Sequence, residues 1–152
     1  MRRILFALAL AVLPVAASGC GDSPTSIEDT RFAASLGVDL ASMTRTASGM
    51  YYRDLAVGTG AVAQSGNMAG VYYKGSLPNA RVFDSLSSGT PFSFRLGTGA
   101  VIRGFDEGIT GMKVGGKRLM VIPPALGYGD REVGSIPANS ILVFEVTLVS
   151  VQ

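Results

Sequence analysis

The stretch VIRGFDEGI, centred on Phe105, constrains the fold of this chain more than any other. Apolar side chains at Phe105, Ile109 and Met112 recur at i, i+4 and i+7, which predicts one face of a helix over 103–110. Gly111 follows as a helix stop, because glycine readily adopts the left-handed conformation that ends many helices. A helix this short is unstable alone. It must therefore pack against a sheet and contribute Phe105 to that core.

The rest of the chain from about residue 50 is typical of strands. The clearest alternation runs over 142–149, where Leu142, Phe144, Val146 and Leu148 would share one face. The other strands are predicted over 50–57, 71–77, 91–96 and 117–122. Glycine and proline stand at the junctions, which fits an antiparallel sheet joined by turns. The sequence thus predicts an α+β domain, with a curled antiparallel sheet of about five strands wrapped around one short helix.

Five blocks of sequence carry a family resemblance. They are YYKGSL (72–77), VFDS (82–85), VIRGFDEGI (101–109), ALGYG (125–129) and SILVFEV (140–146). In this order and at this spacing they resemble the FKBP-type peptidyl-prolyl cis/trans isomerases, across roughly residues 50–152. The resemblance implies the same FKBP-like architecture and an enzyme that rotates Xaa-Pro bonds.

The resemblance also implies a site without metal or cofactor. The polar, catalytic groups would be Asp84, the main-chain N–H of Ile102 and the hydroxyl of Tyr128. The substrate-binding box would be formed by apolar side chains, with Ile136 closing one side: Tyr73, Phe83, Phe92, Val101, Phe105, Ile136 and Phe144. For Phe92, Phe144 and Val101, ordinary core packing is the competing interpretation.

Asp84 is the residue that is hardest to explain as packing. It directly follows Phe83 in an expected strand, and a buried carboxylate is costly unless it has a partner. Tyr73 and Arg95 are both candidate partners, and the sequence leaves the choice open.

The chain departs from the family pattern near the pocket. Phe105 stands where the family usually has tryptophan, so the pocket floor should be shallower and bind bulky macrolides more weakly, with isomerisation largely kept. The loop from Phe83 to Phe92 is about one residue short, and Glu132 replaces other residues common at its position. These changes should affect sequence preference at the rim.

Several kinds of chemistry are absent. The chain has no histidine and one cysteine, Cys20, which excludes metal sites built on His or Cys and nucleophiles paired with His. Asp106 and Glu107 are adjacent carboxylates, but neighbours on a helix point in different directions, and we expect them to favour the helix N-terminus. The run GTGAVA at 58–63 fits a dinucleotide-binding pattern, yet glycines interrupt any following helix. We interpret it as a turn and expect no cofactor.

Residues 1–19 are typical of a lipoprotein signal peptide. A basic start precedes an apolar run over 4–15 and then small residues before Cys20. The ending ASGC resembles a bacterial lipobox, in which the cysteine is lipidated and becomes the mature N-terminus, although Ala17 replaces the commoner leucine. A single cysteine forms no internal disulfide, and lipid gives it a role. Plain secretion after cleavage near Ala17 or Gly19, and a buried core helix, are the alternatives.

The mature chain divides into a tether over 20–49 and an isomerase domain over 50–152. The tether begins polar and turn-rich, but 32–43 is too apolar for a free linker, so we expect part of it to pack on the domain as an edge strand or a short helix. The 13 basic residues include two in the leader, so the remainder balances the 11 acidic residues and the mature chain is neutral. Nucleic-acid binding therefore has no support.

Two functions compete. The favoured one is a monomeric isomerase that assists folding of extracytoplasmic proteins at the bacterial cell envelope, held to the membrane by lipid on Cys20. Its expected partners are proline-containing polypeptides and, by resemblance, macrolide immunosuppressant-type ligands. The alternative is a holdase or receptor that grips proline segments with little turnover. The enzyme is favoured because Asp84, Tyr128 and the aromatic set occur together, and because the loop over 128–137 is too short to hold a large apolar insertion.

Overall fold

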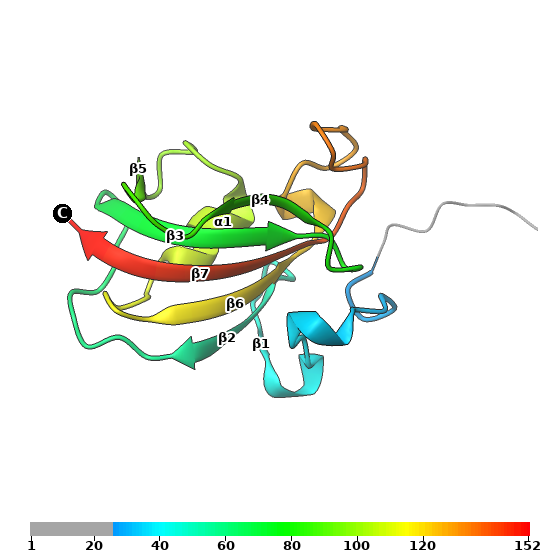
Figure 1. The fold of residues 1–152 in the computed structure, drawn as a ribbon, viewed down its shortest axis with the longest axis horizontal. Coiled ribbons are helices and arrows are strands. Elements are labelled where there is room, and N and C mark those ends of the chain that lie inside the picture. The colour runs from blue at the N-terminus through cyan, green and yellow to red at the C-terminus, as the bar shows by residue number, and fades with distance from the viewer. Residues whose placement is uncertain (1–25) are drawn as a thin grey trace, which may run out of the picture.

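The computed structural model describes residues 26–152, which form one antiparallel seven-stranded sheet with a short helix packed on it (Figure 1). The strands are β1 (Thr44–Arg45), β2 (Tyr51–Ala56), β3 (Met68–Ser76), β4 (Val82–Leu86), β5 (Phe92–Arg95), β6 (Lys117–Ile122) and β7 (Leu142–Val151). The helices are α1 (Arg103–Ile109) and three 3-10 turns, η1 (Ala34–Leu36), η2 (Leu40–Ser42) and η3 (Pro124–Leu126). The predicted α+β class is confirmed.

The sheet order is β1-β2-β6-β7-β3-β4, and β5 also pairs with β3. The centre is the long β3–β7 pair, in which Tyr73 lies opposite Val146 and Gly75 opposite Phe144. Along β7 the predicted alternation is present, since Leu142, Phe144, Val146 and Leu148 all belong to the main core on the inner face of the sheet. This register places the inward side chains of β3 and β7 side by side beneath the helix.

Helix α1 lies close against β6 because two glycines face the sheet. A Cβ at Gly104 would collide with the side chain of Ile122, and one at Gly108 with the sulfur of Met120. Between these glycines, Phe105 is buried and points into the core. The predicted helix is confirmed to within a residue at its C-terminal end, and its close approach fixes where Phe105 lies.

The sheet has two strands outside the five ranges predicted from periodicity, although a strand at Phe83 and Asp84 was expected. β1 is only two residues long, and periodicity has no meaning over that length. β4 has mostly exposed side chains and joins β3 through a register shift between Gly75 and Ser76, so it lacks the alternation of a half-buried strand. Both lie at edges of the sheet, where the burial pattern is weakest.

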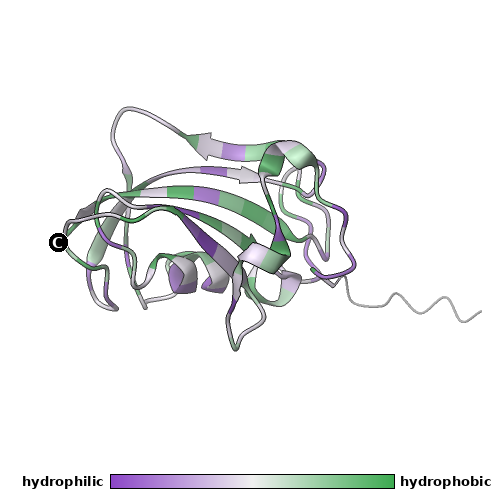
Figure 2. Ribbon diagram, turned by 90° about the horizontal axis from the view of Figure 1, so that it is seen from below, coloured by the Kyte–Doolittle hydropathy of each residue, from purple (hydrophilic) through white to green (hydrophobic). Residues whose placement is uncertain are grey.

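The segment before β2 covers the outer face of the sheet, on the side opposite α1 (Figure 2). Ile27 and Met43 are buried there against Val121 and Val143 from β6 and β7. The expected packing of 32–43 is therefore present, as the two turns η1 and η2 followed by the edge strand β1. The predicted domain boundary at 49/50 falls within the turn between β1 and β2 and stays a prediction.

Hydrogen bonds tie this segment to the sheet. The hydroxyl of Tyr51 donates to Glu28 at 2.7 Å, and Arg53 donates to Ser42 and to the carbonyl of Gly37. Bonds from the hydroxyls of Ser26 and Tyr51 lower the pKa of the Glu28 carboxyl from 4.5 to about 2. The glycine-rich run at 58–63 forms a loop rather than a helix. No helix within residues 26–152 has the length and apolar character needed to cross a bilayer.

Candidate active site

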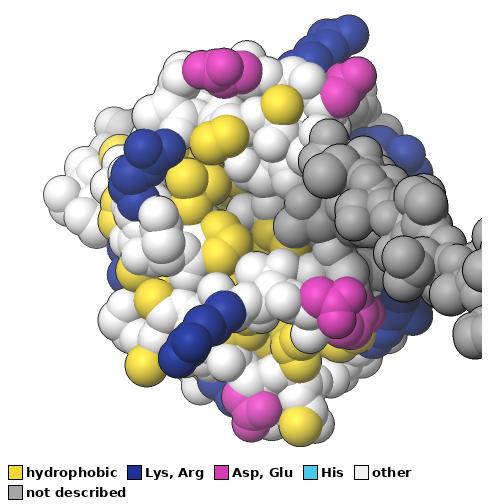
Figure 3. All heavy atoms as spheres, turned by 90° about the vertical axis from the view of Figure 1, so that its right-hand side faces the viewer, with side chains coloured by type: hydrophobic (Ala, Val, Ile, Leu, Met, Phe, Trp, Pro, Cys, Tyr) yellow, Lys and Arg dark blue, Asp and Glu magenta, His cyan; other side chains and the backbone are white. Residues whose placement is uncertain are grey.

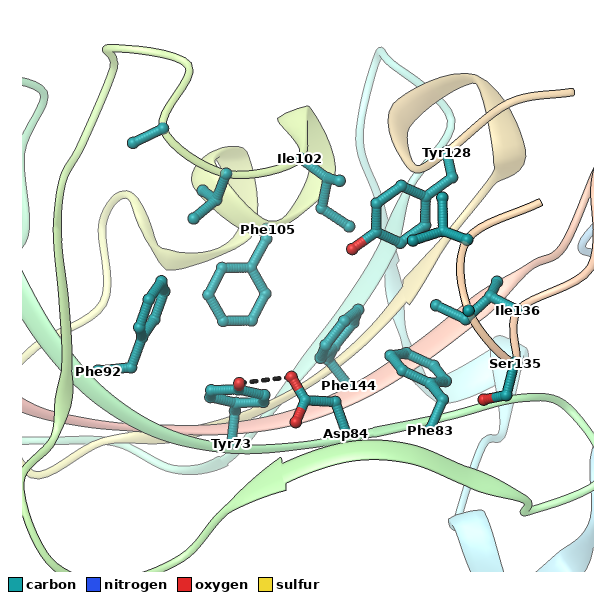
Figure 4. A pocket seen from close by; sticks show the side chains of 14 residues that line it. Tyr73, Phe83, Asp84, Phe92, Ile102, Phe105, Tyr128, Ser135, Ile136 and Phe144 are labelled. Atoms are coloured by element: carbon teal, nitrogen blue, oxygen red, sulfur yellow. Dashed lines mark hydrogen bonds between the residues drawn. The ribbon is translucent and has the colours of Figure 1, made fainter. Parts of the chain in front are cut away.

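A cavity of about 400 Å³ opens between α1, β3, β4 and the loops that follow β5 and η3 (Figure 4). Every pocket residue predicted from the sequence lines it: Tyr73, Phe83, Asp84, Phe92, Val101, Ile102, Phe105, Tyr128, Ile136 and Phe144. The structure thus brings together residues that lie as far apart in the chain as β3 and β7. Their roles in catalysis and binding stay predictions. Cys20, the predicted lipidation site, lies outside the described residues.

The pocket floor is the ring of Phe105, which is 4% exposed. Its centroid lies 5.1 Å from that of Phe144 and 5.8 Å from those of Tyr73 and Phe94. Such edge-to-face and tilted contacts bring the positive edge of one ring toward the negative face of another. The floor is therefore an apolar aromatic surface on which a pyrrolidine ring could pack.

A glycine makes room for the adjoining wall. Gly75 lies opposite both Asp84 on β4 and Phe144 on β7. A Cβ at Gly75 would come within 2.7 Å of the rings of Phe83 and Phe144, which pack edge to face at 5.5 Å. Any larger residue at position 75 would push these two rings apart, so this wall of the pocket requires glycine there.

Asp84 is exposed at the mouth of the pocket, so the expectation of a buried carboxylate is wrong. The reason is that β4 is an edge strand and its carboxylate reaches solvent. Its partner is Tyr73, whose hydroxyl donates to Oδ2 at 2.6 Å, while Arg95 donates instead to the carbonyl of Gly66. Partial burial and this bond raise the pKa of the Tyr73 hydroxyl to about 12, which keeps the phenol neutral.

Several hydrogen-bond donors in the pocket have no acceptor among residues 26–152, and two of them belong to predicted catalytic residues. They are the main-chain N–H of Ile102, just before α1, and the hydroxyl of Tyr128, which points toward the centre of the cavity in Figure 4. A ligand carbonyl that enters this space could accept hydrogen bonds from both donors without any rearrangement of the pocket. The pocket can thus hold an apolar ring on Phe105 and orient a carbonyl beside it.

The rim is apolar as well. Phe92 is 39% exposed and Val133 is 40% exposed at the mouth, so Phe92 is a rim residue rather than core. Phe144, at 5% exposed, is both core and pocket wall. Figure 3 shows hydrophobic side chains gathered in a hollow on this side of the molecule, with charged side chains spread around it. A polypeptide bound here would contact apolar surface beyond the proline itself.

The carboxylates on α1 have structural partners. Asp106 accepts hydrogen bonds from the N–H of Gly97 at 2.9 and 3.0 Å, and Glu107 accepts from the hydroxyl of Ser48 at 2.7 and 2.8 Å. Neither lines the pocket. These bonds hold the loop before α1 and the β1–β2 turn onto the helix. Asp106 also lies in the first turn, as predicted, where the positive end of the helix favours a carboxylate, whereas Glu107 lies beyond that turn.

Four further residues that line the pocket were not predicted from the sequence: Ala100, Val133, Gly134 and Ser135. All lie in loops, where no periodicity identifies a face. The one feature of the sequence that could have identified them is their position next to predicted site residues, because Ala100 precedes Val101 and the other three precede Ile136.

Comparison with known proteins gives one consistent result. Residues 60–149 match the sequence model of the family described as FKBP-type peptidyl-prolyl cis-trans isomerase. FK506-binding protein 3 of Candida albicans is 51% identical over 104 residues, which are 68% of this chain and 24% of that protein. FK506-binding protein 4 of Mycosarcoma maydis is 45% identical over 72% of this chain and 29% of its own length. This chain therefore spans about a quarter of the length of these curated relatives.

Two solved structures are similar over most of the described residues. FkpA from Escherichia coli aligns with a TM-score of 0.67 and 39% identity, over 73% of this chain and 52% of that one. AtFKBP13 aligns with the same TM-score and identity, over 71% of this chain and 97% of its own.

Proposed function

Because this chain belongs to the FKBP-type peptidyl-prolyl cis-trans isomerase family, we propose that it catalyses rotation about Xaa-Pro bonds in folding polypeptides. The observation that carries the proposal is the pocket itself. It pairs an aromatic floor at Phe105 with two unoccupied donors, the N–H of Ile102 and the hydroxyl of Tyr128.

The chemistry requires no nucleophile and no proton transfer. The barrier to rotation, about 18–20 kcal/mol, is the loss of amide resonance. A planar amide is the more dipolar state and prefers water, so a dry pocket favours the twisted state in comparison. Donors fixed for the carbonyl of the twisted amide add to this preference, because they bind the transition state more tightly than the ground state.

Each part of the site has a place in this scheme. Phe105 and the surrounding rings exclude water and hold the proline ring. Tyr128 and the N–H of Ile102 orient the carbonyl of the rotating bond. Asp84 holds the hydroxyl of Tyr73 and so fixes the ring that forms one wall. The exposed apolar rim at Phe92 and Val133 favours substrates with an apolar residue before proline.

The chain acts outside the cytoplasm, attached to the bacterial envelope by lipid on Cys20. Support comes from the basic and apolar run before the ASGC motif, and from the single cysteine for which lipid supplies a role. One acyl chain holds a protein only weakly, whereas a diacylated and N-acylated cysteine gives stable anchoring. Proteins folding at the envelope are then the substrates.

Macrolides of the FK506 type are a second ligand class. Two relatives are named as FK506-binding proteins, and this chain shares 51% and 45% identity with them. The floor here is Phe105, which lacks the indole N–H and part of the area that tryptophan would provide. Binding is therefore weaker than in relatives with tryptophan.

A proline-peptide isomerisation assay on the purified full-length chain tests the function. The chain should accelerate cis/trans exchange of an apolar-Pro peptide at sub-stoichiometric concentration, without metal or cofactor. Tight peptide binding with no acceleration of exchange would instead identify a holdase. Activity that disappears on further purification would identify a contaminant.

A further inference from the structure

The tip of the loop that closes the pocket is a tight hairpin over 133–136, here called the rim hairpin. Val133 and Ile136 exchange backbone hydrogen bonds of 3.0 and 2.9 Å, and Gly134 takes the positive φ that the turn requires. All four residues line the pocket, and Ile136 is buried in the core. The position of this hairpin therefore sets the shape of one side of the site.

Arg81 joins the rim hairpin to the turn that leads into β4. Its guanidinium donates from Nη2 to the carbonyl of Ser135, which is 54 residues away in sequence. Among the hydrogen bonds of residues 26–152, this is the one that links the rim hairpin to another element. Arg81 precedes β4, which carries Phe83, and Figure 4 shows Phe83, Ser135 and Ile136 together at one side of the cavity.

The backbone of Arg81 is held in place by hydrogen bonds of its own. In the turn between β3 and β4, the N–H of Leu77 donates to the carbonyl of Arg81 at 2.9 Å, and the side chain of Asn79 accepts from the N–H of Arg81 at 3.0 Å. The N–H of Ala33, in the segment on the outer face, donates to the carbonyl of Pro78 at 2.8 Å. Because the backbone of Arg81 is held in this turn, its side chain has little freedom to move with the rim hairpin. The hydrogen bond to Ser135 can therefore restrain the hairpin.

We propose that Arg81 is a positioning residue that holds the rim hairpin over the pocket and thereby sets the preference for the residue before proline. The inference rests on the proposed isomerase function. A held rim presents Val133 and Ile136 at a fixed distance from the floor, so a bulky apolar side chain gains contacts that a small one does not. Without the bond the rim hairpin can move to accommodate either kind of side chain. The values of kcat/KM for substrates with a bulky and with a small residue before proline then become more alike.

The test compares Arg81→Ala with Arg81→Lys and with Arg131→Ala in the full-length chain. Arg131 is a matched control because it lies exposed in the same loop and its side chain has no hydrogen bond or ion pair with residues 26–152. The readout is the ratio of kcat/KM for a Leu-Pro peptide to that for a Gly-Pro peptide. Arg81→Ala should lower this ratio roughly three- to fivefold, the scale of one hydrogen bond. Arg81→Lys, which keeps a charged donor, should recover most of the ratio, and Arg131→Ala should leave it unchanged.

Amide hydrogen exchange gives a second readout that does not depend on activity. Arg81→Ala should speed exchange at Val133 and Ile136 and leave β3 and β7 as protected as in the wild type. A wild-type ratio together with wild-type exchange at these amides would overturn the proposal. Equal loss of activity toward both peptides, with faster exchange throughout the sheet, would also overturn it, because that pattern indicates general destabilisation. A wild-type chain that isomerises no peptide would refute the proposed function, while the exchange comparison would still decide whether Arg81 holds the hairpin.

Discussion

The hydroxyl of Tyr73 donates a 2.6 Å hydrogen bond to Oδ2 of Asp84 across the neighbouring strands β3 and β4. The register explains the contact, because Asp84 lies opposite Gly75, two residues along the same face from Tyr73. An exposed carboxylate on an edge strand is thus connected to a ring that packs on the pocket floor at Phe105. This bond couples the mouth of the site to its interior.

The hydrogen bond between Tyr73 and Asp84 predicts that the protein loses stability at alkaline pH. The pKa of Tyr73 is raised from 10 to about 12 by partial burial and by the bond to Asp84, so the folded state favours the neutral phenol. This stabilisation is complete below pH 10 and is lost as the pH rises from 10 toward 12. Tyr73→Phe should therefore make the free energy of unfolding less dependent on pH over this interval. Denaturant unfolding at pH 9 to 12 measures it, and a Tyr73→Phe variant that keeps the wild-type dependence would contradict the prediction.

Two aromatic residues of the same pocket should differ sharply in their effect on stability. Phe144 is 5% exposed and packs against Phe83, Phe105 and Tyr73, whereas Phe92 is 39% exposed at the rim. Phe144→Ala should cost about 3–5 kcal/mol of unfolding free energy, the usual cost of removing a buried aromatic ring. Phe92→Ala should cost well under half of that and act mainly on substrate affinity. Urea unfolding of both variants checks the contrast, and equal losses would contradict the assignment of Phe92 to the rim.

The floor residue should control macrolide affinity more than turnover. Phe105→Trp adds ring area and an N–H to a position that faces the cavity. Affinity for an FK506-type macrolide should rise by about fivefold, since one aromatic contact of this kind contributes on the order of 1 kcal/mol, while kcat/KM for a proline peptide changes less. The chain has no other tryptophan, so quenching of the new residue reports binding directly. Unchanged macrolide affinity in a folded Phe105→Trp variant would show that the floor does not limit binding.

Some of this structure could be predicted from the sequence and some could not. The helix at Phe105 and the alternation along β7 were predictable, because each buries one face and periodicity records burial. Asp84 was placed in the pocket correctly but expected to be buried, since a sequence does not show that its strand is at an edge. The bond from Arg81 to Ser135 gave no signal, because it joins two loops and ends on a backbone carbonyl that any residue supplies. The 3-10 turns over 34–36 and 40–42 were likewise unpredictable in form, although the apolar residues around them indicated packing.

Membrane attachment should depend on Cys20. Cys20→Ser removes the thiol to which lipid is attached, so the variant should appear as uncleaved precursor or as protein released from membranes. Mass spectrometry of the N-terminus should find the wild-type cysteine carrying lipid as the first residue. Unmodified Cys20 in membrane-fractionated wild-type protein would contradict lipid anchoring and favour plain secretion.

The most direct test of the site is kcat/KM for an apolar-Pro peptide in the wild type and in the double variant Asp84→Ala/Tyr128→Phe. Both residues line the pocket and neither is fully buried, so the double variant should keep the wild-type circular dichroism and unfolding midpoint to within a few degrees. The wild type should accelerate isomerisation well above the uncatalysed rate. The double variant should fall by at least about tenfold, because removing one preorganised polar group can already cost this much or more. Equal kcat/KM in the two proteins, with both folded, would contradict the proposed site.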